Sequence, residues 1–90
     1  MTIGTATGMP VVFRHKGFRF VFYSNESHPR EPVPVHAIKH GVDPKFWLSS
    51  EVVVDYNDGF DARTLREETD VIARRREFIM RTRREFFGES

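Results

Sequence analysis

The feature that most constrains the fold is an uninterrupted amphipathic segment over residues 62 to 87. It contains no Gly or Pro, and its large apolar side chains recur every seven residues, at Leu65, Ile72, Ile79 and Phe86. Asp61 is a favourable N-cap and Gly88 a favourable C-terminal stop. The segment therefore predicts one long helix, and its apolar face requires a second layer of structure to cover it.

The preceding residues supply that second layer as short apolar stretches separated by turns. In VVFRHKGFRFVFY, Lys16-Gly17 is typical of a hairpin turn, and Phe18, Phe20 and Phe22 share one side of an extended chain. VHAIK, KFWL and VVVDY read as three more short strands, and Asn57-Asp58-Gly59 as a turn that closes the sheet. We therefore predict an α+β domain: a small antiparallel or mixed sheet of about five strands, with the long C-terminal helix packed on one face.

Length and composition indicate one small domain. Residues 1–8 are small and polar, so we expect a disordered tail followed by a single domain over residues 9–88. The chain has no cysteine, which excludes disulfides and thiolate zinc sites. Its apolar runs are much shorter than the ~20 residues that cross a bilayer, and no secretory signal is evident. We expect a soluble, cytoplasmic protein that needs no cofactor.

The net charge of +1 hides an uneven distribution, because residues 61–87 carry eight arginines and six acidic residues. Many of these charges lie four residues apart, where opposite charges meet on a helix: Arg63 and Glu67, Asp70 and Arg74, Glu77 and Arg81, Arg81 and Glu85. This spacing favours a solvated ladder of ion pairs over a nucleic-acid-binding surface.

Two arginines fall within the apolar stripe of the predicted helix. Helical spacing places Arg76 and Arg83 near its middle and Glu68 at its edge. The commoner explanation is that the aliphatic stems pack against the core, while the guanidinium groups reach the solvent-exposed rim of the core or pair with Asp55 or Asp58. The alternative is that the helix runs past the sheet and presents a partner-binding face, formed by Arg76, Phe78, Arg83, Phe86 and Phe87.

The stretch HPREPVPVH concentrates residues that could act on a phosphate. His36 and His28 are candidate acid/base catalysts, with Arg30 or Lys39 stabilising the charge. Tyr23, Lys45 and Trp47 are candidates for stacking on and binding a nucleic acid. The histidines at 28, 36 and 40 match no metal-ligand spacing, so we expect no metal site.

The alternative to a catalytic role is that the same stretch is only a rigid connector between two strands. Prolines 29, 32 and 34 remove amide donors and favour extended geometry, so we expect a stiff loop that does not lie in a central strand. His36 would then be half buried beside Ile38. Phe46 and Leu48 are predicted to point to one face of their strand, and Lys45 and Trp47 to the other, with either pair facing the core. A core position is the commoner one for tryptophan, and an outward Trp47 would be a stacking platform.

The chain also resembles a known family. The stretch MPVVFRHKGFRFVFYSNESHPREPVPVHAIK, followed by KFWL, VVVDYNDGF and a helix starting ARTLRE, is similar to the small bacterial proteins grouped as domain of unknown function 4160, over residues 9 to 87. Members of that family typically begin at a Met-Pro and carry a His-x-His, whose two positions here are Pro34 and His36. Glu68 and Arg83 stand where the family resemblance leads us to expect apolar residues.

The resemblance implies a partner more than a reaction. The family has no established activity, and its genes often stand beside another small gene in an arrangement like a toxin and antitoxin pair. We therefore expect a non-catalytic module that binds a small protein encoded nearby. The alternative is an RNA-binding or RNA-cleaving toxin that uses the His28–His36 loop, and homodimerisation through the helix is a third reading. The sequence leaves open whether the chain is an enzyme.

Overall fold

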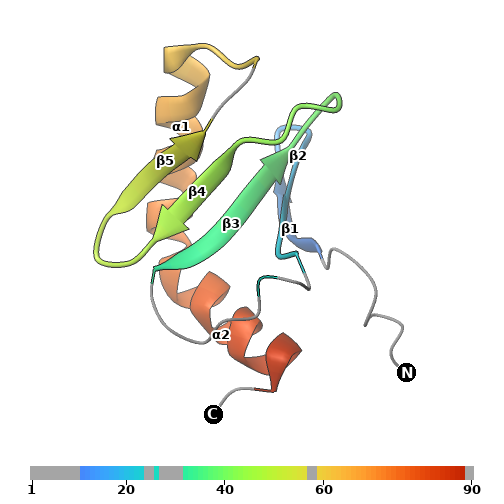
Figure 1. The fold of residues 1–90 in the computed structure, drawn as a ribbon, viewed down its shortest axis with the longest axis vertical. Coiled ribbons are helices and arrows are strands. Elements are labelled where there is room, and N and C mark those ends of the chain that lie inside the picture. Colours follow the sequence, from blue (N-terminus) through green and yellow to red (C-terminus); the bar gives the residue numbers. More distant parts are fainter. Residues whose placement is uncertain (1–10, 24–25, 27–31, 57–58, 89–90) are drawn as a thin grey trace.

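The fold is a five-stranded antiparallel sheet with two helices on one face (Figure 1). The computed structural model describes residues 11–23, 26, 32–56 and 59–88. The strands lie in chain order and are β1 (Val11–His15), β2 (Phe18–Val21), β3 (Val33–Ile38), β4 (Lys45–Leu48) and β5 (Val52–Tyr56). The helices are α1 (Ala62–Arg74) and α2 (Arg76–Phe87). The predicted α+β class and the five strands are confirmed.

Turn and cap residues are placed as the sequence indicates. Lys16 and Gly17 both adopt positive φ, 50° and 85°, as the tight turn between β1 and β2 requires. Asp61 Oδ1 accepts a hydrogen bond of 2.8 Å from the Thr64 amide at the start of α1, and Gly88 ends α2 with φ 71°. The predicted tail (residues 1–8) and most of the turn at residues 57–59 lie outside the described residues.

The main core lies between the sheet and the helices. Alternation along the strands sends every second side chain to this face, where α1 packs on β4 and β5. Phe46 and Leu48 are fully buried there, whereas Lys45 and Trp47 are half buried on the opposite face. The predicted alternation is confirmed, but Trp47 does not take the core position that is commoner for tryptophan. The buried core residues are Phe18, Phe20, Phe22, Val33, Val35, Ala37, Phe46, Leu48, Val71, Ile72 and Ile79.

The prediction of one long helix is corrected to two helices. Arg75 leaves helical geometry, with φ −100° and ψ 16°, and its amide donates to both the Val71 carbonyl and the Ile72 carbonyl. Its guanidinium lies 4.6 Å from the ring centroid of Phe13 on β1 and 4.8 Å from that of Phe78 on α2. These tertiary contacts compensate for the distorted helical backbone, and no Gly or Pro marks the break in the sequence.

Pro34 corrects a second prediction, because it lies in β3, the central strand. The Ala37 amide donates to the Pro44 carbonyl beside β4, so odd-numbered amides of β3 face β4 and even-numbered positions face β2. The pairing with β2 ends at Val21, opposite His36. The nitrogen of Pro34 therefore points beyond the end of β2, where proline removes no ladder hydrogen bond.

The register of β3 gives a stability prediction. Replacing Val35 by proline removes an amide that faces β4, so Val35→Pro should lower the free energy of unfolding by about 3 kcal/mol or more. The neighbouring substitution Pro34→Ala, at a position where the ladder needs no amide donor, should change the free energy of unfolding by less than about 1 kcal/mol. Urea titration followed by circular dichroism measures both. Equal losses in the two variants would contradict this assignment of the strand.

Candidate functional site

His36, the central catalytic candidate of the sequence, is enclosed by carboxylates. Its side chain is 1% exposed. Its Nδ1 lies 2.8 Å from Asp43 Oδ1, and its Nε2 lies 2.8 Å from Glu26 Oε1. Because a carboxylate only accepts hydrogen bonds, the doubly protonated ring is the form that donates to both neighbours. Both ring nitrogens are thus committed to contacts within the domain.

Tyr23 and Lys45 complete a polar cluster, which we define as Tyr23, Glu26, His36, Asp43 and Lys45. The Tyr23 ring stacks on the His36 ring, with centroids 3.8 Å apart, and its hydroxyl donates to Asp43 Oδ2. Lys45 Nζ lies 2.8 Å from Glu26 Oε2. The cluster joins the segment after β2, the strand β3, and the β3–β4 connection with the start of β4.

Glu26 is held from both faces of the sheet. Burial raises the pKa of its carboxyl group, but hydrogen bonds from Lys45 and His36 and their charges outweigh this, so that the pKa is lowered. On the other side, Arg83 Nη2 on α2 donates to the Glu26 carbonyl at 2.9 Å. This contact connects the second helix to the polar cluster.

Arg83 is therefore an interior residue, 1% exposed. Its guanidinium lies 4.7 Å from the centroid of the Phe87 ring and 5.7 Å from that of Phe22. The expectation that Arg83 faces a partner does not match this position, because the helix bends and turns the arginine towards the chain after β2. Its guanidinium donates to the Glu26 carbonyl, an acceptor that sequence spacing does not reveal. Asp58, one of the two carboxylates expected to pair with it, lies outside the described residues.

Among the other catalytic candidates, Lys39 is described by the structure, and it does not contact His36. Lys39 Nζ donates to the Lys16 carbonyl at 3.0 Å and lies 5.0 Å from the centroid of the Phe18 ring, so it points to the β1–β2 turn. His28 and Arg30 lie outside the described residues. The sequence shows Glu26 and Asp43 near the histidines but does not assign them to His36, because they lie ten and seven residues away in loops, at no diagnostic spacing.

The nucleic-acid candidates on β4 are engaged with one another. Lys45 Nζ lies 4.4 Å from the centroid of the Trp47 ring while it is bound to Glu26. Trp47 is half buried. One face of the indole is therefore covered by the lysine, and the lysine charge is offset by a carboxylate.

The aromatic residues of the predicted partner-binding face also pack within the domain. Phe87 lies against the core and contacts Phe22, with ring centroids 6.1 Å apart. Phe86 is half buried and meets Phe87 edge-on at 4.7 Å. Phe78 is half buried and edge-on to Phe13 at 6.3 Å. Arg76, the remaining residue predicted for this face, is half buried and lines two surface hollows.

Arg76 lies where two surface hollows meet, directly after the helix break. The first, about 540 Å³, lies between α1 and the β4–β5 turn and is lined by Leu48, Ser50, Glu51, Val52, Arg66, Thr69, Asp70, Ala73 and Arg76. The second, about 410 Å³, lies on α2 and is lined by Arg76, Glu77, Met80, Arg81 and Arg84. Together we call them the junction groove.

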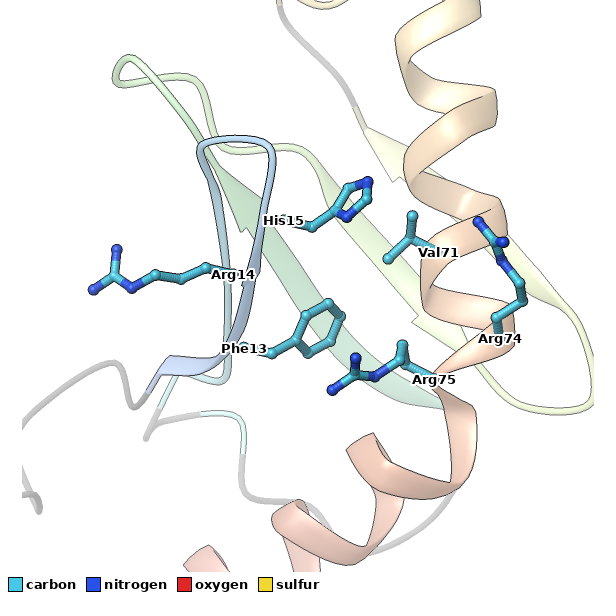
Figure 2. Close-up of a pocket in the computed structure, with 6 residues that line it drawn as sticks. All are labelled: Phe13, Arg14, His15, Val71, Arg74 and Arg75. Atoms are coloured by element: carbon cyan, nitrogen blue, oxygen red, sulfur yellow. The ribbon is translucent and has the colours of Figure 1, made fainter.

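A third hollow of about 280 Å³ lies between β1 and the helix break (Figure 2). Figure 2 shows Phe13 and His15 pointing from β1 towards the helices and Arg75 pointing back towards β1. Arg14 and Arg74 line its margin and point away from it. The interior of this hollow is thus formed by two apolar side chains, Phe13 and Val71, with one guanidinium and one imidazole.

The predicted ladder of ion pairs is present in part. Arg74 Nη2 lies 2.9 Å from Asp70 Oδ2, with both side chains largely exposed. Glu67 instead pairs with Lys16 at 2.6 Å, and hydrogen bonding to this lysine lowers the pKa of the Glu67 carboxyl group. Glu68 is 2% exposed; burial, reinforced by the charge of Glu67, raises its pKa to about 7.

The geometry defines a small α+β domain in which the sheet, two helices and a buried polar cluster are tied together. A family model for a domain of unknown function (DUF4160) matches residues 17–82, and the chain belongs to this family. The match extends from the β1–β2 turn into α2, and so includes His36 and Arg76. No curated protein and no solved structure matches the chain significantly. Within the described residues, no helix is long and apolar enough to cross a membrane.

The polar cluster gives a pH prediction. A carboxyl group with a lowered pKa stabilises the fold above its unfolded value of 4.5, and the contribution is lost as pH falls through the folded pKa. At pH 7, Glu26→Gln should therefore lower the free energy of unfolding by about 1–3 kcal/mol, since it leaves charged donors poorly matched. Below pH 4 the difference from the unmodified protein should shrink. Chemical denaturation of both proteins at a series of pH values measures this difference in the free energy of unfolding. A difference that does not change with pH would contradict a stabilising role of the ionised Glu26 carboxylate.

Proposed function

We propose that this chain is a non-catalytic module that binds a small protein partner, in a pair of the toxin and antitoxin kind, through the junction groove. The observation that carries the proposal is the position of Arg76. It lines both hollows and follows the helix break, so one side chain connects the surface of α1 and β5 with that of α2.

The chemistry of the groove indicates the kind of segment it accepts. Its apolar lining comes from Leu48, Val52, Ala73 and Met80. Four arginines (Arg66, Arg76, Arg81 and Arg84) and three acidic residues (Glu51, Asp70 and Glu77) surround that lining. Asp70 is already paired with Arg74. The remaining excess of positive charge favours an amphipathic partner segment with apolar side chains and carboxylates, of the type that binds as a helix in a groove.

The junction groove includes only part of the partner-binding face predicted from the sequence. Arg76 belongs to the groove, whereas Arg83 and Phe87 serve the interior of the domain. The bend at Arg75 separates these roles, because α2 no longer continues the face of α1.

The RNA-directed alternative has weaker support from the geometry. A phosphate approaching His36 would meet the carboxylates of Glu26 and Asp43, which already hold both ring nitrogens. An RNA phosphate could instead contact the arginines of the junction groove. Salt dependence separates the two cases, because phosphate contacts weaken steeply with salt whereas a largely apolar groove contact does not.

The test is co-expression of the chain with the small protein encoded beside it, followed by co-purification and titration calorimetry. Arg76→Glu reverses the charge shared by the two hollows, and Ala73→Glu places a carboxylate on the exposed lining of the hollow between α1 and the β4–β5 turn. Each should weaken the complex at least tenfold, because like charges across an interface are unfavourable. Circular dichroism should show an unchanged fold.

Arg63→Glu is the matched control, since Arg63 is an exposed arginine on α1 that lies outside the junction groove. It should bind like the unmodified chain. Failure of the unmodified chain to bind the neighbouring protein would overturn the proposal. Equal weakening by Arg63→Glu would remove the groove as the surface. Binding of a single-stranded RNA at low salt, lost in Arg76→Glu and without protein binding, would establish the alternative.

A further inference from the structure

We propose that His15, Glu67 and Glu68 form a binding site for a divalent transition-metal ion of the Zn²⁺ type. The site joins the end of β1 to the first half of α1 and is separate from the junction groove. The inference is independent of the proposed function, because none of the three residues lines that groove.

The three side chains converge on one point. One ligand atom from each, an imidazole nitrogen and two carboxylate oxygens, lie within 4.8 Å of one another. Ligands around a tetrahedral zinc ion, with bonds of about 2.0–2.2 Å, are roughly 3.4 Å apart. Small side-chain rotations would close the set around an ion. The remaining coordination positions would be open to water or to a further ligand.

Glu68 is the observation that distinguishes this cluster from ordinary surface charges. Its side chain is on the buried side of α1 and only 2% exposed. Within the part of the chain that the structure describes, its Oε1 has no hydrogen-bond partner although it is buried. A buried carboxylate oxygen is costly unless it is paired, hydrogen-bonded or bound to a metal. The adjacent imidazole and carboxylate make a metal the fitting ligand.

Lys16 occupies the place of a cation in the present structure. Its Nζ lies 2.6 Å from Glu67 Oε2, and both side chains are substantially exposed. An exposed pair of this kind contributes little stability, so an incoming ion can displace the lysine at small cost. The lysine charge should therefore compete with the metal, a behaviour that a purely structural cluster would not show.

The ligand types select among cations. One imidazole and two carboxylates suit Zn²⁺, and Mn²⁺ less well, whereas Mg²⁺ prefers oxygen ligands and retains its water. The sequence reasoning weighed the histidines at 28, 36 and 40 and did not include His15. The tight β1–β2 turn brings His15 to α1, which spacing along the chain does not reveal.

The experiment is calorimetric titration of the full, tag-free chain with Zn²⁺, Mn²⁺ and Mg²⁺ separately, with imidazole NMR signals recorded in parallel. One Zn²⁺ should bind per chain, more tightly than Mn²⁺ and Mg²⁺, with the His15 ring signals shifted. Glu67→Gln and His15→Ala should each weaken Zn²⁺ binding at least tenfold. Glu67→Gln changes an exposed side chain, so it tests the site even if His15→Ala fails to fold.

Two further variants make the test specific. Lys16→Asn removes the competing charge at a positive-φ position that asparagine tolerates, and it should tighten Zn²⁺ binding. His40→Asn removes an exposed histidine at another positive-φ position outside the cluster, and it should leave binding unchanged. Absence of Zn²⁺ binding, binding unaffected by Glu67→Gln, or an equal loss in His40→Asn would each overturn the proposal.

Discussion

The interactions of Glu26 hold the two halves of this domain together. Its backbone carbonyl accepts a hydrogen bond from Arg83 on α2, and its carboxylate binds His36 on β3 and Lys45 on β4. Besides this hydrogen bond, the buried guanidinium lies against two phenylalanine rings, Phe22 and Phe87, which favour a cation. The helix layer and the second face of the sheet are thus linked through one residue in the segment after β2. His36, a catalytic candidate from the sequence, consequently has both ring nitrogens engaged within the domain.

The break at Arg75 decides which surface is left for function. Because the chain bends there, α2 directs Ile79 and Arg83 inward, and Arg76 is left between two hollows. A straight helix would have carried the apolar stripe of α1 past the sheet and exposed it. The bend replaces that stripe with a groove of mixed apolar and basic character. The cluster of His15, Glu67 and Glu68 lies on the other side of α1, towards β1, so this helix separates the two proposed sites.

Much of the fold could be predicted because its signals are local. The Lys16-Gly17 turn depends on the freedom of glycine at positive φ, and the Asp61 cap depends on one side-chain acceptor beside a free amide. Alternation along KFWL separated Phe46 and Leu48 from Lys45 and Trp47, but the packing of α1 on β4 and β5 decided which pair is buried. The position of Pro34 in a central strand was not predictable, since it depends on where the neighbouring strand β2 ends.

The sequence by itself determined the α+β class, the five strands, the helical segment and its excess of arginine, because periodicity and turn chemistry act over a few residues. Only the tertiary structure decided what the polar residues do. The enclosure of His36 by Glu26 and Asp43, the burial of Arg83, and the meeting of His15 with Glu67 and Glu68 each join residues distant in the chain. Hydrogen bonds and charges act over a few ångströms in space, so their partners follow from the packing of sheet and helices and not from spacing along the chain.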